Sequence, residues 1–287
     1  MSRVIYVNGL YKPYADAAIH AEDRGFQFAD SVYEVIEVLG CKLVDEGRHL
    51  DRLARSLSQI EMKMPMTRPA LAFVIRETIR RNSVRDGIVY LQVSRGAGPR
   101  DFAMPNDSVR PTVVLIARQQ SQSKLAALAD IGIAVVSMPD IRWGRSDIKS
   151  VMLLPACLAK ARAKRAGARE AWFTDPNGFV TEGASSNAWI VNGSGKLVTR
   201  QLDNRILGGV TRAGVKDVAS QDAIEIEERP FSLTEALSAK EAFITSATNT
   251  VMPVTKIDTT MIGDGRPGPV TLRLRSRFHH VAEFRGD

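Results

Sequence analysis

The stretch RSDIKSVMLLP, residues 145–155, places Lys149 at the start of an apolar run. It follows the strand-like segment IGIAVVSMP, residues 131–139. Burying an ammonium group is unfavourable unless the charge is paired. Either the side chain reaches solvent along its apolar stem, or the protein uses the amine. For a single lysine the solvent-exposed interpretation is the commoner one, so other parts of the sequence must distinguish the two.

Around this stretch, hydrophobic periodicity predicts alternating hairpins and helices. Residues 3–16 are predicted to form a hairpin that turns at Asn8-Gly9, and residues 31–46 a second one with a glycine at its turn. Leucines at helical spacing predict a helix over residues 48–62, and a proline at a permitted first-turn position predicts another over residues 69–82.

The fold class follows from the order of these elements. Runs of strands followed by helices in each half indicate an α+β protein and not a doubly wound sheet. Residues 119–130 are polar and then alanine-rich, which is typical of a linker. We therefore predict an N-terminal α+β domain over residues 1–118, an interdomain linker over 119–130 and a C-terminal domain over 131–287.

Composition limits the class of protein. The chain has 287 residues, a net charge of +7 and two cysteines, which predicts no disulfide framework and a reducing cytoplasm. No apolar run reaches membrane-spanning length, the start lacks the apolar core of a signal peptide, and no metal-ligand spacing occurs. The cations are spread out, so anionic metabolites are favoured as ligands. A basic nucleic-acid-binding protein without catalysis remains the alternative from another class.

Several segments carry residues suited to an anionic ligand. RILGGVTRAGV (205–215) has two glycines before a predicted helix start, and SATNT (246–250) has small hydroxyl residues at a strand end. Glu182 lies in a strand-like run among small residues. Arg52 flanks the leucine stripe of its helix, and Tyr33 alternates with valines. Taken singly, a capped helix, a polar loop, an exposed carboxylate, a solvated arginine and a half-buried ring explain these features as well.

Their combination is typical of one cofactor, pyridoxal 5'-phosphate (PLP), which needs an amine, a carboxylate and phosphate-binding loops. The sequence resembles the fold-type IV PLP enzymes, the class IV aminotransferases, over essentially its whole length, and within them the D-amino-acid transaminases. The stretches that carry the resemblance are DRGFQFADSVYEV (23–35), HLDRL (49–53), YLQVSRGAGPR (90–100), DIKSVMLLPACLAK (147–160), VTEGASSN (180–187), ILGGVTR (206–212) and ITSATNTVMPV (244–254).

The resemblance implies a two-domain fold, with a small N-terminal domain and a larger PLP-binding C-terminal domain that has a β-barrel-like core. It implies that Lys149 binds the cofactor aldehyde and moves protons, and that Glu182 pairs with the protonated ring nitrogen. The other residues to which it assigns a place at the cofactor are Arg52, Val210, Thr211, Ala247 and Thr248 on the phosphate, Leu207 on the ring face, and Ser185 and Ser186 near the ring. Tyr33 is expected near the lysine and the substrate.

Arg100 matches the arginine that binds the substrate carboxylate in D-amino-acid transaminases. In that family the arginine comes from the partner subunit, which implies a homodimer whose loop 96–104 completes the partner's site. One departure is that Phe102 stands where the family has a histidine. Either another arginine contributes to carboxylate binding, with Arg24, Arg95 and Arg142 as candidates, or the substrate needs less of a carboxylate clamp.

These features together predict a cytoplasmic transaminase that moves an amino group from a D-amino acid, such as D-alanine or D-glutamate, to a 2-oxo acid, such as pyruvate or 2-oxoglutarate. Three activities of the same fold remain as alternatives: an (R)-amine transaminase, a branched-chain L-amino-acid transaminase and an aminodeoxychorismate lyase. No nucleic acid, membrane or metal partner is expected.

Overall fold

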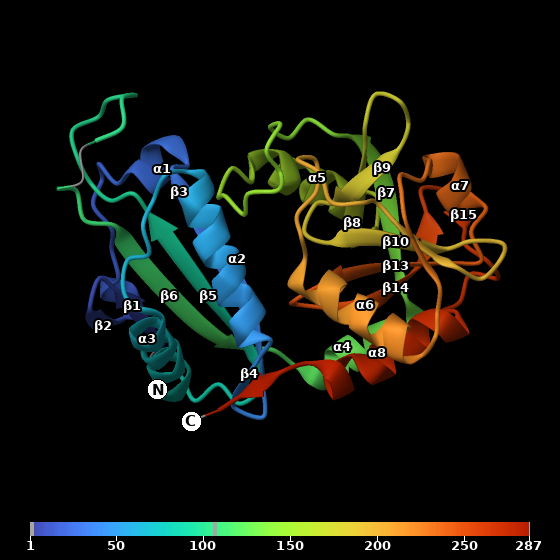
Figure 1. The fold of residues 1–287 in the computed structure, drawn as a ribbon, viewed down its shortest axis with the longest axis horizontal. Coiled ribbons are helices and arrows are strands. Elements are labelled where there is room, and N and C mark those ends of the chain that lie inside the picture. Colours follow the sequence, from blue (N-terminus) through green and yellow to red (C-terminus); the bar gives the residue numbers. More distant parts are fainter. Residues whose placement is uncertain (1–2, 106–107, 287) are drawn as a thin grey trace. The chain divides into compact units, whose positions relative to one another are not determined.

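The computed structural model describes residues 3–105 and 108–286, which divide into two compact units (Figure 1). The first unit comprises Met1–Gln122, Ile148–Met152 and Glu283–Asp287, and the second comprises Ser123–Asp147 and Leu153–Ala282. This division differs from the predicted boundaries, because Ile148–Met152, which carries Lys149, belongs to the first unit. The predicted linker also differs, since most of it is helix α4 (Gln122–Ile131). Its alanines and leucines favour a helix over an extended linker.

The first unit is built on a seven-stranded antiparallel sheet in the order β16-β4-β3-β5-β6-β1-β2. The strands are β1 (Val4–Val7), β2 (Leu10–Pro13), β3 (Ser31–Leu39), β4 (Lys42–Val44), β5 (Gly87–Ser94), β6 (Thr112–Gln119) and β16 (Phe284–Arg285). The predicted hairpin at Asn8-Gly9 is confirmed, with φ values of 47° and 93° at its turn. Positive φ at both residues is what a two-residue hairpin turn requires.

Two helices cover this sheet, and both were predicted (Figure 1). Helix α2 (Glu46–Gln59) buries Leu50, Leu53 and Leu57. Helix α3 (Arg68–Arg81) begins with a proline in its first turn, and Thr67 accepts a hydrogen bond from the Ala70 amide. Neither the short helix α1 (Arg24–Phe28) nor the 3-10 turn η1 (Tyr14–Asp16) was predicted from the sequence.

The segment that carries Lys149 is fixed to the start of strand β3. The Tyr33 amide donates to the Lys149 carbonyl at 3.0 Å, and the Val151 amide donates to the Ser31 carbonyl at 3.1 Å. These bonds and an isolated antiparallel bridge between Val32 and Ser150 attach the segment to the start of β3. The backbone of Lys149 is therefore held by the sheet of the first unit.

The second unit is built on a mixed nine-stranded sheet with the path β12-β11-β10-β13-β14-β7-β8-β9, from which β15 branches at β14. The strands are β7 (Ile133–Pro139), β8 (Glu170–Thr174), β9 (Val180–Gly183), β10 (Asn187–Val191), β11 (Leu197–Thr199), β12 (Ile226–Glu228), β13 (Glu241–Ser246), β14 (Thr250–Ile257) and β15 (Thr260–Met261). The sheet curls into a half-barrel, since β9 at its end lies near β10. The expected α+β fold with a barrel-like second domain is confirmed.

Several helices pack on this sheet. Helices α6 (Val210–Gln221) and α8 (Pro269–Val281) pack on each other and on β13 and β14, and α5 (Leu154–Arg165) packs on β8 (Figure 1). A core cluster of the second unit contains Trp172, Phe231 and Met252. Ser232 caps the short helix α7 (Leu233–Leu237) by accepting a hydrogen bond from the Glu235 amide at 3.0 Å.

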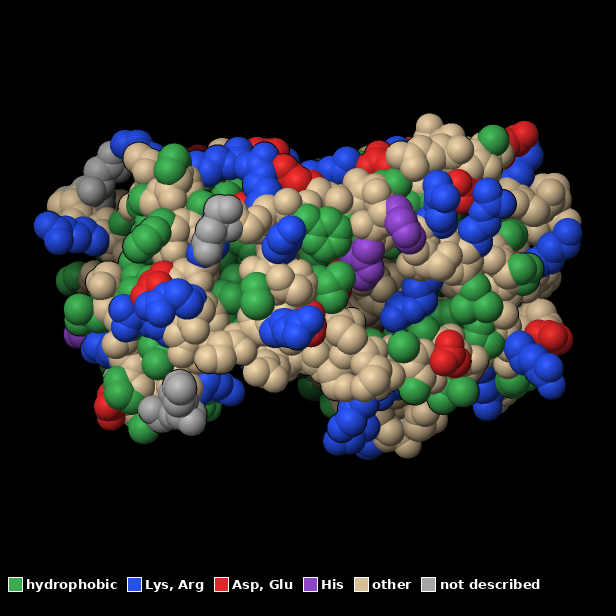
Figure 2. Space-filling model, turned by 90° about the horizontal axis from the view of Figure 1, so that it is seen from below, with side chains coloured by type: hydrophobic (Ala, Val, Ile, Leu, Met, Phe, Trp, Pro, Cys, Tyr) green, Lys and Arg blue, Asp and Glu red, His purple; other side chains and the backbone are tan. Residues whose placement is uncertain are grey.

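Among the described residues, no helix combines the length and the apolar character needed to cross a bilayer. On the face shown in Figure 2, Lys and Arg side chains are interspersed with other types and are not gathered into one patch. A nucleic-acid surface usually concentrates its cations, so this face gives no support to the nucleic-acid alternative.

Candidate functional site

Lys149 has a half-buried side chain in the first unit. Its Nζ lies 4.2 Å from the centroid of the Tyr33 ring, and its backbone amide donates to Ser56 Oγ at 3.3 Å. The Tyr33 ring in turn stacks on Tyr90, with centroids 5.7 Å apart. Lys149 and Tyr33, which the sequence analysis expected to be neighbours, are therefore in contact.

Arg52 points inward, which settles the choice between solvent and an interior anion. Its Nε and Nη2 donate to the two carboxylate oxygens of Glu34, each at 2.7 Å, and His49 Nδ1 lies 2.7 Å from the same carboxylate. Burial alone would raise the pKa of Glu34, but Arg52 and His49 outweigh burial and lower that pKa to about 2. Burial lowers the pKa of His49. The cluster thus combines an ionised carboxylate with a guanidinium.

Glu182 lies in strand β9 of the second unit and is 5% exposed. Its carboxylate accepts hydrogen bonds from Arg142 Nη1, from Asn187 Nδ2 at 2.9 Å and from the Leu207 amide at 3.1 Å. Burial raises its pKa to about 7, although Arg142 acts in the opposite direction. A carboxylate with this pKa gains from a further cation, because pairing would favour its ionised form.

The backbone after Leu207 passes close to Asn187, the residue that donates to Glu182. Asn187 Nδ2 also donates to the Leu207 carbonyl at 2.9 Å, and a Cβ on Gly209 would lie 2.1 Å from Asn187 Oδ1. Helix α6 begins at Val210 and Thr211, which are both buried. Its cap residue is Gly209, which has no side chain to accept a hydrogen bond from the first turn. Such a helix start is suited to an anion.

The loop between β13 and β14 carries Ala247 and Thr248. Ser246 Oγ lies 3.3 Å from Thr248 Oγ1, and Asn249 Nδ2 donates to both hydroxyls at 3.2 Å. Arg275 from α8 holds the end of the loop, since its Nη1 donates to the Asn249 carbonyl at 2.9 Å. The loop is therefore ordered by its own side chains and by α8.

Ser185 and Ser186 share one acceptor, the buried carboxylate of Glu170. Ser185 Oγ donates to Glu170 Oε2 at 2.6 Å, and Ser186 Oγ does so at 3.3 Å. Lys160 Nζ lies 3.3 Å from the other oxygen of Glu170. The two serines are therefore positioned as a pair by a glutamate that the sequence analysis did not single out.

Arg100 and Phe102 belong to an exposed loop of the first unit, where Phe102 is 80% exposed. The Arg100 guanidinium lies 5.3 Å from the Phe28 ring centroid and 5.6 Å from that of Phe102. Arg24 fixes the loop, because its Nη1 donates to the Asp101 carbonyl at 2.6 Å while its Nε donates to Asp30 at 2.8 Å. The loop thus presents a cation beside two aromatic rings.

The three arginines considered as substitutes for the missing histidine are all occupied by protein groups. Arg24 holds the loop just described, and Arg95 donates to Asp30 at 2.7 Å and to the Ile60 carbonyl at 2.6 Å. Arg142 binds Glu182 and Asp140. These contacts give the three arginines a structural role. None of the contacts supports a role in binding the substrate carboxylate.

The predicted residues fall into two groups, one in each unit. The first unit holds Lys149, Tyr33, Arg52, Arg100 and Phe102. The second unit holds Glu182, Ser185, Ser186, Leu207, Val210, Thr211, Ala247 and Thr248.

Three residues with contacts in the site, Glu34, Asn187 and Glu170, were not predicted from the sequence. Glu34 had a detectable signal: in SVYEVIEVL it shares the two-residue alternation of Val32 and Ile36, which places a carboxylate on a core face. Glu170 had none, because its serine partners are 15 and 16 positions away, and Asn187 showed no periodicity that pointed to Glu182, five positions before it.

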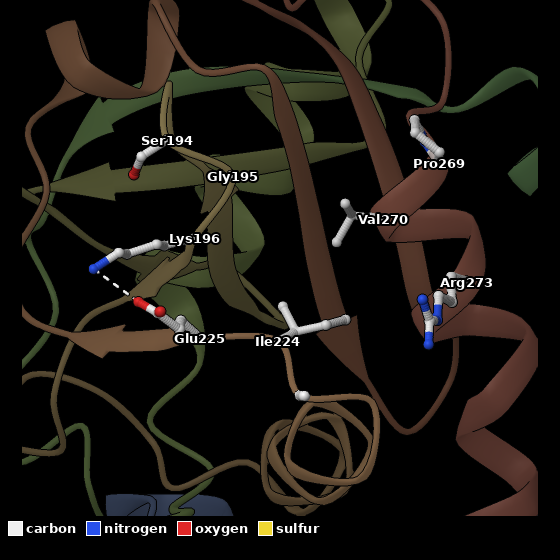
Figure 3. A pocket seen from close by; sticks show the side chains of 9 residues that line it. Ser194, Gly195, Lys196, Ile224, Glu225, Pro269, Val270 and Arg273 are labelled. Carbon is white, nitrogen blue, oxygen red and sulfur yellow. Dashed lines mark ion pairs between the residues drawn. The ribbon is translucent and has the colours of Figure 1, made fainter.

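The second unit also contains a pocket of about 430 Å³ (Figure 3). Its lining residues are Ser194, Gly195, Lys196, Ala223, Ile224, Glu225, Pro269, Val270 and Arg273. Lys196 and Glu225 form an ion pair of 2.8 Å there. None of the predicted site residues lines it. Within residues 3–105 and 108–286, no group of His, Cys, Asp and Glu side chains is arranged to hold a metal ion.

Comparisons with known proteins agree on one family. The model of the family described as Amino-transferase class IV matches residues 31–257. A D-alanine aminotransferase of Staphylococcus haemolyticus is 35% identical and is covered over 98% of both chains. One of Listeria monocytogenes is 36% identical, over 96% of this chain and 94% of its own.

Solved structures agree with the fold. A T.th. branched-chain amino acid aminotransferase with pyridoxamine 5'-phosphate has a TM-score of 0.90 at 25% identity, covering 98% of this chain and 94% of its own. The branched-chain amino acid aminotransferase of Escherichia coli has a TM-score of 0.89 at 24% identity, with the same coverage.

Proposed function

Because this chain belongs to the class IV aminotransferase family, we propose that it transfers an amino group from a D-amino acid to a 2-oxo acid with PLP as cofactor. D-alanine and D-glutamate are the proposed donors, and pyruvate and 2-oxoglutarate the proposed acceptors. The relatives named D-alanine aminotransferase, at 35–36% identity over nearly the whole chain, support the D-amino-acid substrate. The observation that carries the proposal is the half-buried Lys149 amine in contact with Tyr33.

The residues present fit PLP in three respects. Lys149 offers an amine for the aldehyde. Glu182 is a buried carboxylate whose pKa of about 7 leaves it in need of a cation such as a protonated ring nitrogen. The first turn of α6 begins after Gly209 without a side-chain cap, which leaves it suited to a phosphate. An amine, a carboxylate and an anion site are the set that this cofactor needs.

When bound, PLP supplies an aldehyde that receives the amino group and an aromatic ring that accepts the electron pair released at the substrate Cα. Lys149 Nζ would hold the aldehyde group and, once released by the substrate amine, would move a proton at the substrate Cα. The Glu182 carboxylate would pair with the ring nitrogen and favour its protonated form. Leu207 would pack on the ring, and Ser185 and Ser186, whose hydroxyls donate to Glu170, would lie near it as hydrogen-bond acceptors.

Phosphate binding is proposed for residues of both units. Arg52 supplies a guanidinium, Val210 and Thr211 supply amides and a hydroxyl at the start of α6, and Ala247-Thr248 supply the loop after β13. Because Arg52 is already oriented by Glu34 at 2.7 Å, it needs little reorganisation to receive an anion. Tyr33, Arg100 and Phe102 are proposed to contact the substrate.

The proposal includes a homodimer in which loop 96–104 of one subunit completes the site of its partner. A loop that holds Arg100 beside an 80% exposed Phe102 is suited to a role outside its own subunit, because a guanidinium recognises carboxylates in a bidentate manner. The free cysteines Cys41 and Cys157 are both exposed, which supports a cytoplasmic location.

The absent histidine motivates one second candidate function. With Phe102 exposed on the substrate loop, an (R)-amine transaminase remains the alternative that needs less of a carboxylate clamp. A screen of D-alanine, L-alanine, (R)-1-phenylethylamine, L-leucine and aminodeoxychorismate with pyruvate and 2-oxoglutarate separates the candidates. Turnover of D-alanine well above the rest is expected. Preferential turnover of any other donor would replace the proposed substrate class.

The lysine is tested with Lys149→Ala and, as a matched control, Lys240→Ala, which changes an exposed lysine. The wild type and the control are expected to be yellow, to bleach with D-alanine and to incorporate label from borohydride at residue 149. The Lys149→Ala variant should keep its circular dichroism spectrum and lose the label and turnover. A colourless, PLP-supplied wild type that binds DNA or RNA in a salt-dependent manner would instead favour the nucleic-acid alternative.

A further inference from the structure

Arg142 lies between two carboxylates in the second unit. Its Nη2 lies 2.7 Å from Asp140 Oδ2, its Nε lies 2.9 Å from Asp140 Oδ1, and its Nη1 donates to Glu182 Oε1. The same guanidinium also donates to the Arg205 carbonyl at 2.9 Å and stacks 4.8 Å from the Phe173 ring centroid. Only 12% of the Arg142 side chain is exposed. The guanidinium is therefore fixed in one orientation.

The charges of this cluster do not balance. The charged groups with the largest effects on the pKa of Glu182 are Arg142 and Asp140, while Asn187 Nδ2 and the Leu207 amide donate to Glu182 as neutral groups. Two carboxylates that share one guanidinium leave a net charge of −1 when both are ionised. A buried net charge is unfavourable unless it is paired. One more cation would therefore neutralise the cluster.

We propose that Arg142, oriented by Asp140, is a positioning residue that sets the protonation of Glu182, so that the site prefers a ring with a protonatable nitrogen over a ring of the same shape without one. The ring preference depends on the proposed function, whereas the coupling of Arg142 to Glu182 does not. The two neighbours of Glu182 have opposite effects. Arg142 favours the ionised carboxylate and Asp140 disfavours it.

Because Arg142 and Asp140 act on Glu182 in opposite directions, their substitution should shift its midpoint in opposite directions. A purely structural role of Arg142 would not produce this result. Apo protein labelled with δ-¹³C glutamate is titrated by NMR, and the Glu182 signal is assigned with Glu182→Gln. Arg142→Gln should raise the Glu182 midpoint by about one pH unit or more, because a cation is lost, and Asp140→Asn should lower it. Arg142→Lys retains the charge and should leave the midpoint closer to the wild-type value than Arg142→Gln does.

An unchanged midpoint in both folded variants, or a shift in the same direction in both, would overturn the coupling. If Arg142→Gln does not fold, Asp140→Asn and Arg142→Lys still decide the matter. The coupling is supported if Asp140→Asn lowers the Glu182 midpoint and Arg142→Lys moves that midpoint by less than Asp140→Asn does. Any other pair of results overturns it.

The ring preference is tested with PLP and its 1-deaza analogue, which lacks the ring nitrogen. Dissociation constants are measured by absorbance on apo protein. The wild type should bind PLP more tightly than the analogue, and Arg142→Gln should reduce that ratio by about tenfold. An equal loss of affinity for PLP and for the analogue would mean that Arg142 only maintains the structure of the site. If PLP leaves the Glu182 NMR signal unmoved, the assignment of Glu182 to the cofactor fails, while the Arg142–Glu182 coupling stands.

Discussion

At the scale of single residues, two buried glutamates have pKa values shifted in opposite directions. The Glu34 carboxylate receives two hydrogen bonds from Arg52 and lies against His49, and its pKa falls to about 2 despite burial. Glu182 shares its guanidinium with Asp140, and its pKa rises to about 7. Burial is similar in the two cases, so the number of cations per carboxylate decides the charge.

The Arg52–Glu34 pair should contribute strongly to stability. Arg52→Met leaves a fully buried carboxylate with one partner fewer, and the free energy of unfolding of the apo protein should fall by about 3 kcal/mol. Urea unfolding measures the loss. Arg85→Met is the matched control, because the Arg85 side chain is 81% exposed and its ion pair with Asp86 spans 3.9 Å. Equal stability of the two variants would contradict the prediction.

The same carboxylate predicts a pH dependence. The pKa of Glu34 is about 2 in the folded protein, against its usual value of 4.5. The folded state therefore gains stability from Glu34 above pH 4.5 and loses it as the pH falls toward 2, because the unfolded chain binds the proton first.

Between pH 7 and pH 3, the loss that Glu34 causes should be about 2 kcal/mol. Urea unfolding of the wild type and of Glu34→Gln across this range measures it. The variant should be less stable at pH 7 and show a shallower decline. Parallel curves would mean that Glu34 is not the group responsible.

At the scale of elements, most helices and strands could be predicted because their apolar residues repeat with a helical or strand period. Helices α2, α3 and α6 and the hairpin at Asn8-Gly9 formed where that pattern placed them. The linker did not, since its alanines continue into helix α4. Helix α1 was missed because its five residues are too few for periodicity to register.

The junction before α6 predicts a difference between two adjacent glycines. A Cβ on Gly209 would lie 2.1 Å from Asn187 Oδ1, whereas a Cβ on Gly208 would meet nothing nearer than Leu202 at 3.9 Å. Asn187 cannot move without losing its bonds to Glu182 and to the Leu207 carbonyl. Gly209→Ala should therefore lower the free energy of unfolding by about 2 kcal/mol and weaken PLP binding.

Gly208→Ala is the control and should retain both properties. Urea unfolding of the apo proteins and absorbance titration with PLP give the comparison. If the two alanine variants behave alike, the close approach at Gly209 does not constrain this junction.

At the scale of the whole molecule, the proposed site draws on segments far apart in the sequence. Ile148–Met152 interrupts the second unit and belongs to the first, where it pairs with β3. The two units therefore share the chain in an interleaved way.

The proposed dimer predicts complementation between two inactive variants. Lys149→Ala lacks the amine, and Arg100→Ala should lose most of its turnover of D-alanine. If Arg100 acts on the partner's site, a mixed dimer contains one site with both residues. Mixing the variants after dissociation should then restore up to about a quarter of wild-type activity, from statistical reassortment of a C₂ dimer.

Size-exclusion chromatography with light scattering checks that the mixture is dimeric, and each variant reassorted with itself is the control. Activity that stays at the level of the separate variants would place Arg100 in its own subunit's site, or exclude a dimer if the mass is that of a monomer.

The sequence by itself determined the family, the fold class and the identity of the candidate residues, because periodicity and short motifs are local properties of a chain. The contacts of these residues came only from the tertiary structure. Arg52 on Glu34, Arg142 on Glu182 and the serine pair on Glu170 each join residues 15 to 40 positions apart. Charge depends on burial and on such neighbours, so the protonation of Glu34 and Glu182 was decided by packing and not by residue type.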